Sequence, residues 1–165
     1  MTLEIIYLFI FALFLWYLSF TATRLDRLHH RVETSWAALD GLLQRRAAIA
    51  LEIAHTDFAD PGLCLILTEA AQQAREAEIQ IRSEAESGLT TALNLVIENN
   101  EQYGYYKDLV RELNDLTDRI RVAIKLHVES VNRTQAIRKK IVVKMFRLAG
   151  HAPLPAIYKF EEDVI

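Results

Sequence analysis

The sequence has little cysteine, proline or glycine: of 165 residues, one is cysteine, three are proline and five are glycine. The single cysteine, Cys64, excludes a disulfide framework and a zinc site made of four thiolates. No Gly-rich phosphate loop, no G-x-S-x-G motif and no H-E-x-x-H motif is present, so the commonest sequence signals of catalysis are missing. We therefore predict that the protein is not an enzyme and that it holds no cofactor and no metal ion.

The charge is nearly balanced, with 19 Lys and Arg against 22 Asp and Glu, a formal net charge of −3. A chain without a basic excess has no overall attraction to a polyanion, so we expect no nucleic-acid partner. Hydrophobic residues make up 52% of the chain and are most concentrated at its N-terminus.

Residues 5–23 carry no charge and are almost entirely apolar. At about 1.5 Å per helical residue, such a run is close to the ~30 Å hydrocarbon core of a bilayer. Arginines follow this run, whereas Met1–Glu4 has no base. A cleaved signal peptide begins with basic residues, so this pattern disfavours one. We predict that residues 1–23 form a single-pass anchor in the cell membrane, with the N-terminus outside and the remainder in the cytoplasm.

Residues 24–150 are expected to be helical, because apolar residues recur there at a spacing of three and four and Pro61 is the only proline before Pro153. The first helix is predicted to continue from the anchor to about Phe58. Asp60 stands before Pro61 where an N-cap residue would begin the next helix. The predicted class is all-α.

Helices of roughly equal length over 24–58, 61–102 and 107–150 favour an elongated antiparallel bundle of three long helices. A reversal at Ser87-Gly88 would make it four, and we prefer three. Pro153 and Pro155 predict that residues 151–165 form an extended C-terminal tail.

Few residues suggest chemistry. His29 and His30 lie three or four residues from Asp26 and Glu33, but no third metal ligand follows at a suitable spacing, so we interpret them as solvated. Cys64 begins the second helix, where a helix dipole lowers a thiol pKa, but its apolar neighbours favour an inert thiol.

The stronger signal is a charge asymmetry, because residues 130–160 contain seven bases and no acid. Four of these bases share one side of the predicted last helix and form the basic stripe: Arg133, Lys140, Lys144 and Arg147. In the three-helix layout the basic stripe lies far from the membrane and beside the acidic second helix. There the stripe is either neutralised by the acidic helix or available to dock a partner protein. In the four-helix layout it reaches anionic headgroups.

One stretch resembles the first cytoplasmic helix of the bacterial LemA family. The matching positions are Arg31, Val32, Trp36, Asp40, Leu43, Arg45 and Arg46. Residues 117–131 and 148–155 are similar to later blocks of the family. The chain departs from the family where Ala47–Leu51 replaces a segment with proline and where His127–Val131 replaces one with Tyr-Asn. The resemblance implies a membrane-tethered helical bundle and no assigned activity.

Together these features predict a membrane-tethered scaffold that binds an unidentified protein or a second copy of itself. An accessory subunit of a membrane enzyme, such as a protease, is the alternative. An enzyme that uses His29, His30 or Cys64 is a third reading, which the lack of a recognisable catalytic set disfavours.

Overall fold

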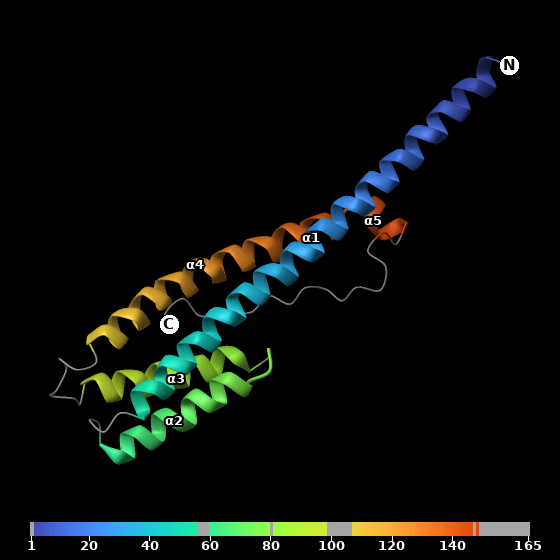
Figure 1. Cartoon of the computed structure of the whole chain (residues 1–165). Helices are drawn as coiled ribbons and strands as arrows, with labels where there is room; N and C mark the ends of the chain where they lie inside the picture. Colours follow the sequence, from blue (N-terminus) through green and yellow to red (C-terminus); the bar gives the residue numbers. More distant parts are fainter. Residues whose placement is uncertain (1, 56–59, 80, 99–106, 147, 149–165) are drawn as a thin grey trace. The chain divides into compact units, whose positions relative to one another are not determined.

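The structure is a computed structural model that describes residues 2–55, 60–79, 81–98, 107–146 and 148. These residues form helices and turns with no strand, which confirms the all-α prediction. The helices, shown in Figure 1, are α1 (Thr2–Ala54), α2 (Pro61–Glu76), α3 (Arg82–Glu98), α4 (Lys107–Arg138) and α5 (Ile141–Met145). The predicted tail over 151–165, the turn near Asn99 and the end at Phe58 fall outside the described residues.

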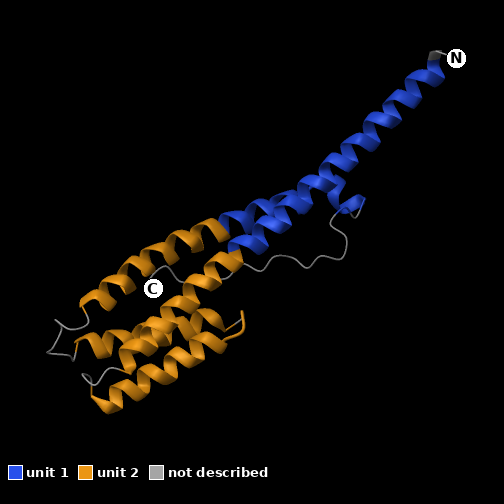
Figure 2. Cartoon of the chain, in the orientation of Figure 1, with its two compact units in different colours: residues 1–35, 128–157 blue, residues 36–127, 158–165 orange. Residues whose placement is uncertain are grey.

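The chain divides into two compact units, coloured separately in Figure 2. Unit 1 comprises Met1–Ser35 and Val128–Ile157, and unit 2 comprises Trp36–His127 and Tyr158–Ile165. The long helices α1 and α4 each contribute one part to each unit.

In unit 1 the C-terminal part of α4 lies antiparallel to the first part of α1. The Thr134 hydroxyl is 3.5 Å from the Leu28 carbonyl oxygen, and the ring of Phe146, which follows α5, meets the Phe14 ring nearer the N-terminus of α1. Leu25 and Val131 are fully buried. This small core holds α4 against the residues that follow the uncharged run of α1.

Unit 2 is an up-down-up-down bundle of four helices. Asp40 pairs with Arg82 and Arg46 bonds to Thr90, so α3 runs parallel to α1. Arg45 pairs with Glu112, and together with the Trp36–His127 contact this makes α4 antiparallel to α1. Helices α2 and α3 form an antiparallel hairpin.

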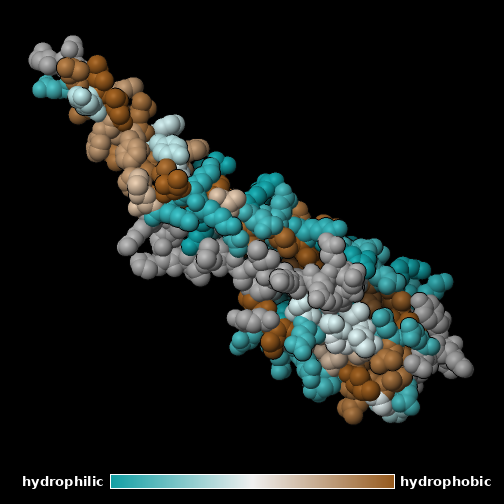
Figure 3. Space-filling view, turned by 180° about the vertical axis from the view of Figure 1, so that it is seen from behind, coloured by the Kyte–Doolittle hydropathy of each residue, from teal (hydrophilic) through white to brown (hydrophobic). Residues whose placement is uncertain are grey.

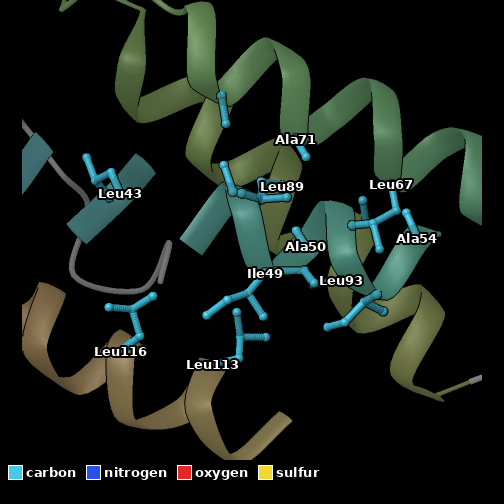
Figure 4. Close-up of a cluster of buried hydrophobic side chains, with 14 of the residues drawn as sticks. Leu43, Ile49, Ala50, Ala54, Leu67, Ala71, Leu89, Leu93, Leu113 and Leu116 are labelled. Atoms are coloured by element: carbon cyan, nitrogen blue, oxygen red, sulfur yellow. The ribbon is translucent and has the colours of Figure 1, made fainter. Parts of the chain in front are cut away.

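The core of unit 2 is a single cluster to which all four helices contribute, and Figure 4 shows part of it. Its small residues allow the helices to approach closely, while its leucines and isoleucines fill the space between them. The buried members are Leu39, Leu43, Ala47, Ile49, Ala50, Ile53, Ala54, Leu67, Ala71, Ala74, Leu89, Ala92, Leu93, Val96, Leu113, Leu116 and Ile120.

The preference for one long helix over 61–102 is wrong. The chain reverses between α2 and α3, whereas Gly88 lies inside α3. No proline or glycine marks this reversal. The Arg82 side chain instead donates to the Ala77 carbonyl at 3.0 Å, which satisfies a backbone acceptor at the end of α2. Tertiary packing of the two apolar faces therefore overrides good local helix propensity.

The predicted start of α2 is confirmed. The Asp60 carboxylate accepts hydrogen bonds from the backbone N–H groups of Gly62 at 2.8 Å and Leu63 at 3.3 Å, and Pro61 occupies the first turn. An N-cap aspartate satisfies donors that have no partner within the helix, so α2 begins where the local sequence requires.

Candidate functional site

The N-terminal part of α1 is long and apolar enough to cross a membrane. Its most apolar window is only 6% buried, whereas the core helix of a soluble protein is mostly buried. Figure 3 shows this hydrophobic surface on the visible face. Exposed aliphatic and aromatic side chains in such density are costly in water and favourable in lipid.

The basic stripe does not lie on one helix. Helix α4 ends at Arg138, and Lys140 has extended backbone angles before the short helix α5 begins. Arg133 pairs with Glu129 on its own helix, while Lys140 and Lys144 have exposed side chains. Arg147 lies outside the described residues. The expected continuous last helix to residue 150 is therefore wrong, because α4 breaks after Arg138.

The end of α4 and the residue that follows α5 contact the first part of α1. Nη1 of Arg138 is 3.4 Å from Nε2 of His29, and the ring centroids of Phe146 and Phe14 are 5.4 Å apart. Phe14 belongs to the uncharged run. The three-helix layout, which directed the stripe away from the anchor, is contradicted by these two contacts. The reversal between α2 and α3 makes α4 run back toward the start of α1 within unit 1.

A buried ionic cluster links α1 to α3 inside unit 2. Arg46 is 3% exposed and Glu86 is fully buried, and their side chains meet at 2.9 Å. Nη2 of Arg46 also donates to the Thr90 hydroxyl at 2.7 Å. Arg82 binds Asp40 and lies 3.7 Å from the second carboxylate oxygen of Glu86. Two bases and two acids are therefore held together between the helices.

Burial dominates the electrostatics of this cluster. It raises the pKa of the Glu86 carboxyl and lowers the pKa of the Arg46 guanidinium, and the attraction between the two groups opposes both shifts. Because Arg46 and Glu86 are almost fully enclosed, a dissolved substrate has no direct access to them. We assign the cluster a structural role, in which unpaired charge would penalise any shifted register of α1 against α3.

His29 and His30 belong to unit 1, whereas Cys64 belongs to unit 2. Partial burial, followed by the charge of Arg138, lowers the pKa of His29, while His30 is exposed and lies 4.0 Å from Glu33. Burial and then Asp60 raise the pKa of the Cys64 thiol, opposite to the shift that a nucleophilic cysteine requires. Among the described residues, no group of three or more His, Cys, Asp or Glu is placed to hold a metal ion.

Trp36 lies partly buried against the core of unit 2, with its ring centroid 5.6 Å from that of His127. His127 itself is buried, and this burial lowers its pKa.

The ionic cluster is the feature that the sequence analysis missed. Arg46 interrupts the apolar spacing of the helix that follows the uncharged run. The charge of Arg46 at a core-facing position is the one sequence signal that could have indicated the cluster. Its partners, Arg82 and Glu86, carried no local signal because a charged residue at helical spacing is usually solvated.

The chain matches no protein-family model, no curated protein and no solved structure in the comparisons made.

Proposed function

We propose that this protein is a membrane-tethered docking protein of the LemA type, with its N-terminus outside the cell membrane and unit 2 in the cytoplasm. The supporting observation is that α1 is one uninterrupted helix over Thr2–Ala54. Its first part is the exposed apolar segment, and its last part contributes Leu39, Leu43 and Ile53 to the core of unit 2. A tether and a folded bundle are therefore joined with no flexible linker in the sequence.

The orientation follows from charge. Arg24, Arg27 and Arg31 come directly after the uncharged run, and Glu4 precedes it. Basic residues flanking a span are retained on the cytoplasmic side. A reporter enzyme that works only in the cytoplasm, fused after Ile165, is expected to be active, and alkaline carbonate should leave the protein in the membrane. An inactive fusion, or release by carbonate, contradicts the tether.

A docking role requires a surface on unit 2 that another protein can cover. Leu65 and Ile66 on α2 are exposed at 70% and 51%, and hydrophobic side chains gather over the start of α2 in Figure 3. Exposed apolar side chains next to one another are typical of protein-binding surfaces. We therefore place the partner contact at the start of α2.

The test is a photo-crosslinking amino acid incorporated at Leu65 in the full chain in cells, with exposed Asp115 on α4 as the matched control position. We expect a discrete crosslinked species from position 65 and none from position 115. A crosslink to the chain itself identifies self-association, and one to a membrane protease identifies the accessory-subunit alternative. The same faint products at both positions would contradict docking at α2.

A further inference from the structure

Helix α5 lies against the segment that we assign to the membrane. The Phe146 and Phe14 rings meet edge to face, with an interplanar angle of 65°. Phe14 stands ten residues before Arg24, the first base after the uncharged run, which is about 15 Å along a helix axis at ~1.5 Å per residue. If Arg24 marks the edge of the hydrocarbon, Phe146 lies well below the headgroups of that leaflet.

Two large apolar side chains of α5 are exposed. Ile141 is 81% exposed and Met145 is 66% exposed, whereas Val143 is buried. Surfaces of this kind are unfavourable in water but lose that penalty among acyl chains. The adjacent contact with Phe14 brings this face to the same environment.

Three lysines accompany these apolar residues: Lys139, Lys140 and Lys144. Their side chains are exposed, and no ion pair among the described residues engages them. A lysine next to an apolar surface can keep its stem in the acyl region and extend its ammonium group to the phosphates. The combination of inserted apolar groups with flanking lysines is typical of interfacial helices.

We propose that residues 139–146 form a second membrane contact, in which α5 lies in the cytoplasmic leaflet beside α1 and the three lysines bind anionic lipid headgroups. The proposal rests on the proposed function, because it needs the uncharged run of α1 to be in the membrane. The contact between Phe146 and Phe14 favours lipid over a soluble partner protein as the occupant. A surface next to Phe14 is accessible to lipid once α1 has been inserted.

The experiment uses the full chain reconstituted in vesicles of neutral phosphatidylcholine, with or without 30% phosphatidylglycerol. Met145→Cys in a Cys64→Ala background carries an environment-sensitive fluorophore. We expect a blue-shifted emission that acyl-chain spin labels quench, and a stronger shift in the anionic vesicles. Each lysine contributes about fivefold to binding at an anionic surface, so Lys139→Gln, Lys140→Gln and Lys144→Gln together should weaken insertion of the label roughly a hundredfold.

Two controls separate the proposal from the tether itself. In the first control, a label at Asp115, an exposed site of unit 2, should stay water-exposed in both vesicles. In the second, Phe146→Ala should move the label at position 145 toward water, whereas Phe9→Ala should not. Carbonate resistance reports insertion of α1 independently. The lipid contact is overturned, and the tether is not, if the chain resists carbonate but its label at position 145 remains in water. The same conclusion follows if the lysine substitutions do not affect that label. Extraction by carbonate overturns both.

Discussion

The buried pair of Arg46 and Glu86 makes the sharpest prediction about stability. Removing one member of a buried ion pair leaves the other charge enclosed without its partner, at a cost of about 3–5 kcal/mol. Arg46→Met should lie at the lower end of this range, because Arg82 remains 3.7 Å from Glu86. Glu86→Leu should lie at the upper end, because it leaves the Arg46 guanidinium with the Thr90 hydroxyl as its remaining hydrogen-bond acceptor in the cluster.

The double variant should behave differently from the sum of its parts. Replacing both members with apolar side chains removes the charges and their desolvation together, and such replacements are often neutral or stabilising. Arg82 keeps Asp40 and the Ala77 carbonyl, and the Thr90 hydroxyl keeps its bond to the Glu86 backbone carbonyl at 2.9 Å. We expect the free energy of unfolding of the double variant to lie within about 1 kcal/mol of the wild type.

The assay is denaturant unfolding of the full chain in mild detergent, followed by circular dichroism at pH 5 and pH 8. The pKa of Glu86 is raised in the folded state, so its protonation favours folding below its unfolded pKa and the benefit is lost as the pH rises through the folded value. The defect of Arg46→Met should therefore shrink at pH 5. Additive defects in the double variant, or single defects below about 1 kcal/mol, would refute the assigned burial of the pair.

Three further predictions concern single positions. Gly88→Ala should raise the free energy of unfolding by about 0.5–1 kcal/mol, because Gly88 is helical and an added Cβ meets nothing within 4 Å. A loss of stability would instead indicate that the chain turns at Gly88. Trp36→Ala should cost about 2 kcal/mol, less than the ~3–5 kcal/mol of a fully buried aromatic, because Trp36 is only partly buried, and thermal unfolding that matches the wild type would make it an exposed docking residue. Burial lowers the pKa of His127, so the wild type should lose more stability than His127→Phe as the pH falls below the ordinary histidine value of 6.5. Parallel pH profiles for the two proteins would show that His127 is not buried in its neutral form.

A segment apolar and long enough to cross a membrane and the helical class both follow from the sequence alone, because both depend on short-range properties. The length of an uncharged run and the spacing of apolar residues can be read along the chain with no knowledge of the fold. The start of α2 is equally local, since the Asp60 side chain bonds to backbone groups two and three residues away. Neither the apolar run nor the N-cap needs a contact with a distant part of the chain.

The reversal between α2 and α3 was decided by tertiary structure. Ser87-Gly88 was the only weak point visible in this segment, yet Gly88 is accommodated inside α3. A single glycine in a helix costs about 1 kcal/mol, which the burial of Leu89 and Leu93 in the core exceeds. The direction of α4 depends on this reversal, and so does the contact of Phe146 with Phe14.

The ionic cluster shows the same division most clearly. Arg46 could be recognised from the sequence as a charge at an apolar position, but its partner Glu86 is 40 residues away. The energy of an ion pair depends on the distance between the two groups and on the exclusion of water, and neither quantity is encoded by local spacing. Only the packing of α3 along α1 determines that these two charges meet at 2.9 Å in the core.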